Sequence, residues 1–323
     1  MTREGAGTEA VPAPDHARGS RPSSVARVTS PAGQIHAALA DDSSDLLAHK
    51  AAAENFPVAL RFLPRRYRAY LTAVYNFART VDDVGDEAPP RDRLRLLDEL
   101  DGDLTRIYAA RHDSVPRSPP VYPAVCGLAG VIADCAIPVQ CFRDLINANR
   151  QDQVVTRYET FDELLGYCAL SANPVGRIVL LVFGCSTPER AELSDAVCSG
   201  LQIVEHLQDI GEDLRAGRVY LPAADMRSYD CSERDLAGQA ASPQLRRLVA
   251  AEADRAARLI DSGAPLVGQL RGYARVAVAG YIAGGRAAIA AIRAADHDVL
   301  SGLRKPTKSR TVRELAAILI RWR

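Results

Sequence analysis

Residues 70–87, "YLTAVYNFARTVDDVGDE", join an apolar helical pattern to a run of four acidic side chains. Asp82 and Asp86 are four residues apart, and Asp83 and Glu87 repeat that spacing, so on a helix each pair lies on one face. Like charges at this spacing repel each other, and Asp and Gly are poor helix formers. Either something outside the stretch compensates this charge, or the helix frays into the loop "APPR" with its acids in water.

A second acidic row lies in residues 200–222, "GLQIVEHLQDIGEDLRAGRVYLP". Glu205, Asp209 and Asp213 follow each other at steps of four, with Gln202 just before them, and apolar residues surround the row. Steps of four drift by only about 40° each on an α-helix, so the three acids form one stripe. A stripe of acids in apolar surroundings is not typical of an ordinary solvated helix face.

If the two acidic rows face each other across one cavity, five carboxylates share a small volume. Two unit charges about 4 Å apart interact by about 4 kcal/mol at an effective dielectric constant of roughly 20, so cations are needed to balance them. Hard divalent ions take oxygen ligands, and Mg²⁺ combines a few carboxylates with oxygens of a bound phosphate. We therefore expect Mg²⁺, or Mn²⁺ in its place, shared with a diphosphate.

Arginines flank both acidic rows. Arg79 lies three residues before Asp82, while Arg215 and Arg218 follow Asp213. Guanidinium groups bind phosphate oxygens through paired hydrogen bonds, so these side chains are candidates for diphosphate ligands. The alternative is the more common fate of a single arginine, a helix-end charge or a partner for a nearby acid.

Composition is typical of a globular protein. The chain has 323 residues, 47% of them hydrophobic, which is enough for a substantial core. Lys plus Arg and Asp plus Glu are balanced at 40 each, so no basic field favours nucleic acid as a partner. The seven cysteines show neither metal-ligand spacing nor a small disulfide framework, and reduced thiols fit a cytoplasmic location. We predict no signal peptide and no membrane span.

Apolar residues recur at three- and four-residue spacing through most of the chain, and strand-like alternation is hard to find. We therefore predict an all-α protein. We expect a disordered tail over 1–38, a helical domain over 39–304 and a basic amphipathic helix over 305–323. The pattern predicts helices over 44–54, 64–87, 91–111, 121–135, 138–156, 161–184, 188–216, 243–270, 271–295 and 311–322, and it leaves 223–242 unassigned.

Three stretches, in this order along the chain, resemble the motifs of a known family. The first is "YNFARTVDDVGDE" at 75–87 and the last is the acidic row of 200–222. Between them, "DQVVTRYETFDELLGYCALSANPVG" at 152–176 places a Tyr-Cys pair before a small-residue segment. Together they resemble the squalene/phytoene synthase family over about residues 45–300. The resemblance implies a single-domain isoprenoid synthase fold, an all-α terpene synthase-like bundle around a central cavity, and a prenyl diphosphate substrate.

Within this family, "ENFPVALRFLP" at 54–64 and "SANPVG" at 171–176 resemble most the bacterial hydroxysqualene synthase branch of the hopanoid pathway. The resemblance implies a Mg²⁺-dependent lyase that ionises presqualene diphosphate, rearranges the cation and lets water capture it. The implied products are hydroxysqualene and diphosphate, in squalene and hopanoid biosynthesis. No NADPH is expected.

The site residues of the family carry over onto matching positions of this sequence. The resemblance implies catalytic roles for Tyr167, Arg79, Arg218 and Tyr220. It implies substrate contacts for Asn55, Arg79, Gln202, Arg218 and Asn173. The implied metal ligands are Asp82, Asp86, Glu205, Asp209 and Asp213.

The sequence also departs from the family pattern. Glu205 stands where many relatives have a metal-binding Asn, which adds a charge. Asn55 stands where farnesyl-condensing members carry a Ser-Phe signature, which puts the condensation of two farnesyl diphosphates in doubt. "SANPVG" replaces an Ala-Gly segment, and Pro174 is expected to kink its helix near Tyr167.

Two other functions stay open. A condensing squalene or phytoene synthase would be a prenyltransferase that joins two prenyl diphosphates, such as farnesyl diphosphate, head to head. A protein of another class would bind isoprenoids without catalysis, or act as a scaffold for other enzymes of the pathway.

Two further features have alternative interpretations. Aromatic candidates for the cavity wall, which are more often plain core residues, are Phe77, Tyr158, Phe161, Phe183 and Tyr273. The basic segment 305–323 either docks on the core, which we favour, or makes a peripheral contact with an anionic membrane.

Overall fold

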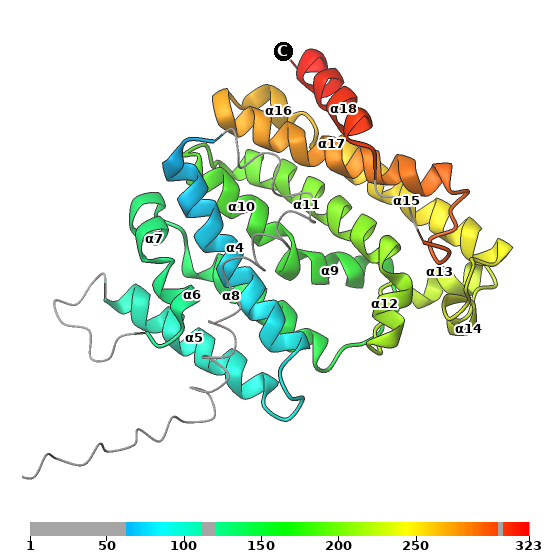
Figure 1. Ribbon diagram of the computed structural model, residues 1–323, viewed down its shortest axis with the longest axis horizontal. Coiled ribbons are helices and arrows are strands. Elements are labelled where there is room, and N and C mark those ends of the chain that lie inside the picture. The colour runs from blue at the N-terminus through cyan, green and yellow to red at the C-terminus, as the bar shows by residue number, and fades with distance from the viewer. Residues whose placement is uncertain (1–62, 111–119, 303–305, 323) are drawn as a thin grey trace, which may run out of the picture. The chain divides into compact units, whose positions relative to one another are not determined.

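The structure, a computed structural model, describes residues 63–110, 120–302 and 306–322, which belong to one compact unit within Asp42–Arg323. The part of the chain so described is α-helical and contains no strand, only an isolated bridge between Arg157 and Val219. Its helices are α4 Arg65–Asp86, α5 Arg93–Ala109, α6 Pro123–Cys126, α7 Ala129–Cys135, α8 Val139–Asp152, α9 Phe161–Ser171, α10 Asn173–Val182, α11 Pro188–Gln208, α12 Ile210–Arg215, α13 Ala223–Ser228, α14 Glu233–Leu236, α15 Pro243–Gly263, α16 Leu266–Gln269, α17 Gly272–Ala294 and α18 Lys308–Arg321 (Figure 1). The all-α prediction is confirmed, whereas the predicted helix 44–54 and the tail 1–38 lie outside the described residues.

Four of the predicted helices are each divided into two. The range 121–135 contains α6 and α7, 161–184 contains α9 and α10, 188–216 contains α11 and α12, and 243–270 contains α15 and α16. Pro174 lies in the first turn of α10, where its missing N–H costs no intrahelical hydrogen bond, so the break falls at Ala172, close to the expected kink. The unassigned range 223–242 contains two short helices, α13 and α14.

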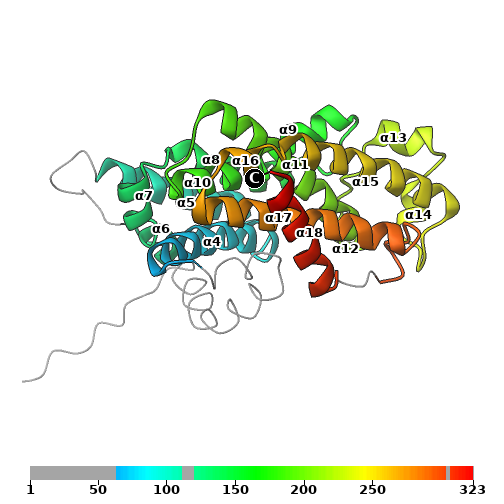
Figure 2. The same cartoon turned by 90° about the horizontal axis from the view of Figure 1, so that it is seen from above.

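The two long helices α11 and α15 pack closely against each other, and α17 packs on both (Figures 1 and 2). Glycines bring these helices together. A Cβ atom on Gly200 would lie 2.7 Å from Ile260 Cγ1 and 2.9 Å from the Ala256 carbonyl oxygen, and one on Gly263 would lie 2.3 Å from the Leu193 carbonyl oxygen. The backbones therefore approach to a distance that a larger side chain prevents.

The C-terminal helix α18 packs on α17, on the outside of the bundle (Figures 1 and 2). Ile318 is fully buried, and Arg275 of α17 donates hydrogen bonds to the carbonyl oxygens of Leu319 at 2.8 Å and Trp322 at 3.0 Å. The favoured interpretation of this segment, docking on the core, is the arrangement seen.

Two helical stretches, Phe161–Val182 and Gly272–Ala294, are long and apolar enough to cross a membrane by length and composition alone. In the 18-residue apolar window of each stretch, 56% and 61% of the residues, respectively, are buried inside the protein. Core helices of large bundles have this composition, so we assign both stretches to the core.

Candidate functional site

The two acidic rows line one cavity of about 640 Å³. Its walls come from α4, α8, α9, α10, α11, α12, α16 and α17, together with the loop that follows α12. The acidic and basic side chains lie on α4, on α8 and around the junction of α11 with α12. The remaining walls are mostly apolar and come from α9, α10, α11, α16 and α17.

Asp82 and Asp86 lie on the last two turns of α4 and face the cavity. Asn149 of α8 donates a hydrogen bond from Nδ2 to Asp82 Oδ1 at 3.0 Å. The carboxylate of Asp82 is reached from the cavity, but protein atoms surround it closely. Burial among them raises the pKa of Asp82 to about 6, and the nearby charge of Asp86 adds to this rise, while the Asn149 hydrogen bond opposes it. The charge predicted to need a counter-ion is thus present in the cavity wall.

The second acidic row is bent. Asp209 lies between α11 and α12, with Glu205 and Gln202 on α11 before it and Asp213 on α12 after it, and all four line the cavity. The predicted continuous stripe is therefore wrong in detail, because weak helix formers at Asp209 and Gly211 let the helix end. Asp209 makes no side-chain cap bond to α12. Burial raises its pKa, and the nearby charge of Asp213 raises it further.

Oxygen donors of this kind suit a hard divalent ion. Among the described residues, however, no three Asp, Glu, His or Cys side chains lie close enough together to hold an ion by themselves. The carboxylates instead stand as separate groups on α4 and around the α11–α12 junction. Mg²⁺ binds through one or two carboxylates and completes its shell with water and phosphate oxygens, so this donor set fits Mg²⁺ bound together with a diphosphate.

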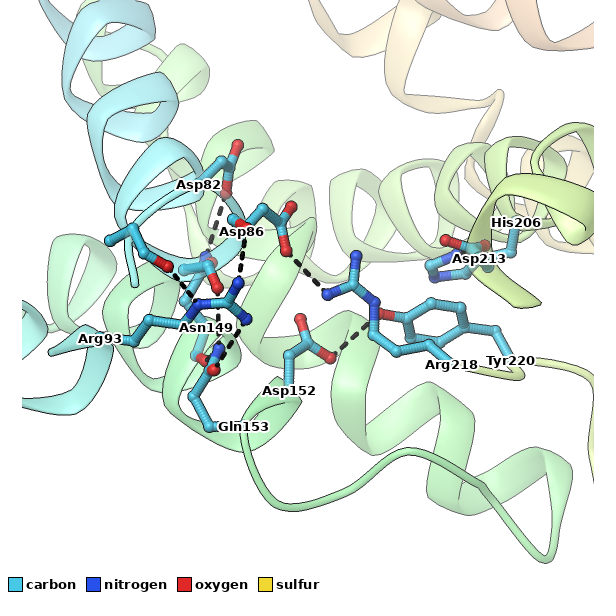
Figure 3. Close-up of polar contacts among 12 residues, drawn as sticks. Asp82, Asp86, Arg93, Asn149, Asp152, Gln153, His206, Asp213, Arg218 and Tyr220 are labelled. Atoms are coloured by element: carbon cyan, nitrogen blue, oxygen red, sulfur yellow. Dashed lines mark hydrogen bonds and ion pairs between the residues drawn. The ribbon is translucent and has the colours of Figure 1, made fainter. Parts of the chain in front are cut away.

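Arg218 connects the two acidic motifs directly. It follows α12, and its Nη1 lies 2.7 Å from Asp86 Oδ1 at the end of α4, as Figure 3 shows. Burial opposes its charge, but neighbouring Tyr220, Asp86 and Asp152 outweigh burial and raise the pKa of Arg218, so it stays cationic. Segments more than 130 residues apart thus meet at the cavity mouth.

Arg79 also lines the cavity, but its partners lie on or next to its own helix. Its Nη2 is 2.7 Å from Asp83 Oδ1 and 3.3 Å from Glu87 Oε1. Of the two interpretations of Arg79 drawn from the sequence, a diphosphate ligand or a partner for nearby acids, the structure shows the second. Among the described residues, its buried Nε has no hydrogen-bond partner.

Asp152, at the end of α8, is a cavity residue that sequence analysis quoted but did not assign. The phenol of Tyr167 donates to Asp152 Oδ2 at 2.7 Å, and the phenol of Tyr220 donates to Asp152 Oδ1 at 3.0 Å. Burial raises the pKa of Asp152, and the two phenol hydrogen bonds oppose that rise. The pKa of Tyr167 lies well above its usual value because the phenol is buried, so Tyr167 remains a donor. The signal that could have found Asp152 is its place at the start of the middle motif.

His206 is a second cavity residue without a prior assignment. Its ring stacks on Tyr220 with centroids 3.8 Å apart, and its Nδ1 lies 3.8 Å from Asp213 Oδ2. The side-chain amide nitrogen of Gln202, Nε2, lies 3.3 Å from His206 Nε2. The ring of Tyr167 also contacts Tyr220, with centroids 5.3 Å apart. Tyr167 and Tyr220, both predicted at the site, therefore belong to one aromatic cluster beside the acids.

Two predicted substrate contacts are not among the cavity residues. Asn173 is buried away from this cavity, and its Oδ1 accepts a hydrogen bond from Ser199 Oγ at 3.0 Å, which ties α10 to α11. A substrate contact through Asn173 thus stays a prediction without a contact in this structure. Asn55 lies outside the described residues.

The aromatic residues proposed for the cavity wall do not line it; these are Phe77, Tyr158, Phe161, Phe183 and Tyr273. Phe77 is fully buried and packs edge-on against Phe142, with centroids 5.2 Å apart. The wall aromatics are instead Tyr167, Tyr220 and Tyr281. Spacing alone could not separate the two sets, because core and cavity faces of one bundle are both apolar.

Three comparisons with known proteins agree with this geometry. The squalene/phytoene synthase family model matches residues 49–311. The chain belongs to the squalene/phytoene synthase family. Members of this family are prenyltransferase-type enzymes that act on prenyl diphosphates, and the cavity is the candidate site for such a substrate.

Relatives within the squalene/phytoene synthase family include a hydroxysqualene synthase from Rhodopseudomonas palustris, 39% identical over 68% of this chain and 72% of the relative. A phytoene synthase from Mycobacterium tuberculosis is 33% identical over 79% of this chain and 85% of the relative. The crystal structure of a squalene synthase from Alicyclobacillus acidocaldarius matches with a TM-score of 0.69 and 38% identity, over 82% of this chain and 94% of the other. The isoprenoid synthase fold predicted from the sequence is thus confirmed.

Proposed function

We propose that this protein is a Mg²⁺-dependent hydroxysqualene synthase that converts presqualene diphosphate into hydroxysqualene and inorganic diphosphate, without NADPH. The observation that carries the proposal is the contact between Arg218 and Asp86, which joins both acidic motifs above a cavity with apolar walls. The relatives named hydroxysqualene synthase, at 34–39% identity, support the choice of reaction within the family. A place in squalene and hopanoid biosynthesis follows from the proposed product.

The polar end of the cavity suits the departure of a diphosphate. Mg²⁺, when bound, neutralises the charge that develops on the leaving diphosphate. Asp82, Asp86, Asp209 and Asp213 would hold the ion, with Glu205 beside them. Arg218 stays cationic and is already at the mouth of the cavity, so it can bind diphosphate oxygens by exchanging Asp86 for them.

The apolar end suits the hydrocarbon part of the substrate and the carbocation formed when diphosphate leaves. Val175 and Val179 of α10, Leu201 of α11 and Val278 of α17 contribute to its walls. Gly176 and Gly285 line this end and let α10 and α17 pack closely on α11, since a Cβ atom at either position would lie about 2.5 Å from a side chain of α11. Walls of this kind exclude bulk water, so the cation survives long enough to rearrange.

The test uses the full chain with presqualene diphosphate. With Mg²⁺ it is expected to release diphosphate and to form a C30 alcohol identified by mass spectrometry, and chelation of the metal should abolish both. Mn²⁺ is expected to replace Mg²⁺, and added NADPH should change neither rate nor product. Absence of turnover with this substrate and Mg²⁺ contradicts the proposal.

A second function is supported by the similarity to phytoene synthases, at up to 33% identity. The protein would then be a condensing enzyme that joins two farnesyl or geranylgeranyl diphosphates. Consumption of either diphosphate as sole substrate, faster than that of presqualene diphosphate, would favour this function. A non-catalytic role in binding isoprenoids would be favoured if Asp82→Ala left function in the cell unchanged.

We propose that the protein is cytoplasmic. A peripheral contact with a membrane, made through α18, is a separate proposal that is tested below. All seven cysteines are free, which fits a reducing compartment. The exposed face of α18 carries Arg310, Arg313 and the apolar side chains Val312 and Ile320. Flotation with anionic liposomes, comparing the full chain with a chain that ends at Leu303, tests the contact. Equal flotation of both chains would contradict a role for this helix.

A further inference from the structure

Ser171 is the last residue of α9, and its hydroxyl group has no role in the site described above. The residue lines the cavity, yet its Oγ is buried and has no hydrogen-bond partner in the part of the chain that the structure describes. A serine at this position of a helix ordinarily bonds to the carbonyl oxygen four residues earlier, here that of Tyr167. This hydroxyl does not do so. A buried polar group without a partner in the protein calls for an explanation, such as strain, a functional role or a bound water.

The position of Ser171 in the cavity is specific. Tyr167, one turn before it, binds Asp152 at the polar end of the cavity. Val175 and Val179, on α10 after it, belong to the apolar walls. One helical turn spans about 5.4 Å, so the Ser171 hydroxyl lies at the boundary between the two ends. The reacting carbon of a bound prenyl diphosphate must lie near this boundary, because it joins the diphosphate to the hydrocarbon.

Other hydroxyl groups of the cavity already have partners. The phenols of Tyr167 and Tyr220 donate to Asp152. Ser194 lies on the same apolar part of the wall, and its hydroxyl interacts with the thiol of Cys198. Ser171 therefore differs from these groups, because it lines the cavity and its buried hydroxyl has no hydrogen-bond partner among the described residues.

We propose that Ser171 positions the water molecule that captures the rearranged carbocation. This inference rests on the proposed function and deepens it. Ser171 Oγ accepts a hydrogen bond from the water and leaves a lone pair of the water oxygen free to form the bond to the cationic carbon. The oxonium ion that results loses one proton to the departed diphosphate, so the products are the alcohol and protonated diphosphate. Without a positioned water, the cation loses a proton from a neighbouring carbon to the same diphosphate and becomes a hydrocarbon.

This difference makes product composition the decisive measurement. Both routes release one diphosphate per substrate, whereas only water capture gives the alcohol. In Ser171→Ala, diphosphate release from presqualene diphosphate with Mg²⁺ should stay within about threefold of the wild type. The ratio of alcohol to hydrocarbon should fall by roughly five- to tenfold, as expected for the loss of one hydrogen bond. Ser171→Thr keeps the hydroxyl and should restore the ratio.

The matched control is Ser194→Ala, which removes a bonded hydroxyl from the same cavity and should leave the ratio unchanged. An unchanged ratio in Ser171→Ala, or an equal fall in Ser171→Ala and Ser171→Thr, overturns the inference. If Ser171→Ala fails to fold, Ser171→Cys provides the second variant, and a wild-type ratio in it counts against the inference because a thiol is a weak acceptor. Failure of the proposed function is distinguishable, since the wild type itself would then release no diphosphate.

Discussion

In the sequence, only its place at the start of the middle motif marks Asp152, yet its carboxylate accepts hydrogen bonds from two tyrosine phenols at the cavity wall. Tyr167 comes from α9 and Tyr220 from the segment after α12, so this one carboxylate connects the middle motif to the second acidic motif. Positioning of this kind affects rate more than fold, because small displacements of active-site groups are costly for catalysis.

Replacing Asp152 with Asn keeps one carbonyl acceptor and removes the other along with the charge. We expect kcat for presqualene diphosphate to fall by roughly 10- to 100-fold, because one of the two phenols loses its acceptor. Steady-state kinetics on the purified variant measure the effect. Asp144→Asn, on the same helix but away from the cavity, should keep wild-type kinetics, and equal kinetics for both variants would remove Asp152 from the site.

Glu252 is a buried acid outside the cavity, beside Arg255 and Asp225. Burial raises the pKa of Glu252 from its ordinary value of 4.5 to about 7. Between about pH 4.5 and pH 7, Glu252 therefore binds more protons in the native state than in the unfolded state. Its contribution to stability is fully present below about pH 4.5 and is lost as pH rises through about 7.

We expect Glu252→Gln to remove this pH dependence. The free energy of unfolding of the wild type, relative to the variant, should decrease by on the order of 2–3 kcal/mol between pH 4.5 and 8, and the two curves should run parallel above pH 8. Urea denaturation at a series of pH values checks this. Parallel curves over the whole range would show that Glu252 is ionised in the native state at ordinary pH.

At the scale of elements, close packing of α11 against α15 determines where the second acidic row can lie. Gly200 allows the approach in the middle of α11, only a few residues before Gln202 and Glu205 enter the cavity wall. A helix pair of this kind fixes the direction of the side chains that follow it along the chain. Stability and site geometry are therefore coupled in α11.

Gly200→Ala is expected to destabilise the protein by about 1–3 kcal/mol. Its Cβ would lie within 3 Å of Ile260 Cγ1 and the Ala256 carbonyl oxygen, and this overpacking exceeds the gain in helix propensity. Gly280→Ala is the matched control, since Gly280 lies inside α17 with open space at its Cβ position and should gain about 0.5–1 kcal/mol. Chemical denaturation distinguishes the two, and effects of the same sign would contradict the packing argument.

The packing of α18 on the core can also be tested at the scale of a single element. Ile318 is fully buried against the core, while Ile320, two residues later, is 65% exposed. Ile318→Ala should lower the free energy of unfolding by about 2–4 kcal/mol, whereas Ile320→Ala should change it by less than about 0.5 kcal/mol. Equal, small effects of both would indicate that α18 is detached in solution.

At the scale of the whole molecule, the candidate site exists only because distant segments of the chain converge. Asp86 is the last residue of α4, and Arg218 follows α12. Arg218 Nη1 lies 2.7 Å from Asp86 Oδ1, although 132 positions separate the two residues in the sequence. The acidic groups of both motifs repel each other across the cavity, so binding of cations together with an anion should stabilise the assembled state more than either does alone.

This coupling predicts a non-additive thermal shift. Mg²⁺ together with inorganic diphosphate, at about 100 times the dissociation constant, should stabilise the protein by about 2.7 kcal/mol and raise Tm by roughly 5 °C. The Tm shift with Mg²⁺ alone and the Tm shift with diphosphate alone should add up to less than the shift with both together. Differential scanning fluorimetry measures the shifts, and Asp82→Ala should lose the excess. A strictly additive response would mean that ion and diphosphate do not share the site.

Much of this protein was determined by the sequence itself. Helical periodicity is a local property, so the all-α class and most helices could be predicted, with errors where Pro174, Pro265 and Asp209 end a helix early. The acidic rows and Arg218 could be proposed for one site because residue type and spacing restrict their chemistry, whereas Tyr167 and Tyr220 were implied by the resemblance to the squalene/phytoene synthase family.

The tertiary structure alone decided what depends on contacts between distant segments. It showed that Asp152 accepts hydrogen bonds from two tyrosines, that Asn173 accepts one from Ser199, and that the predicted wall aromatics do not line the cavity. It also placed Ser171 in the cavity wall with a buried hydroxyl that has no partner in the described part of the chain. The physical reason is that a helix pattern specifies which face is apolar, but not whether that face meets another helix or a cavity.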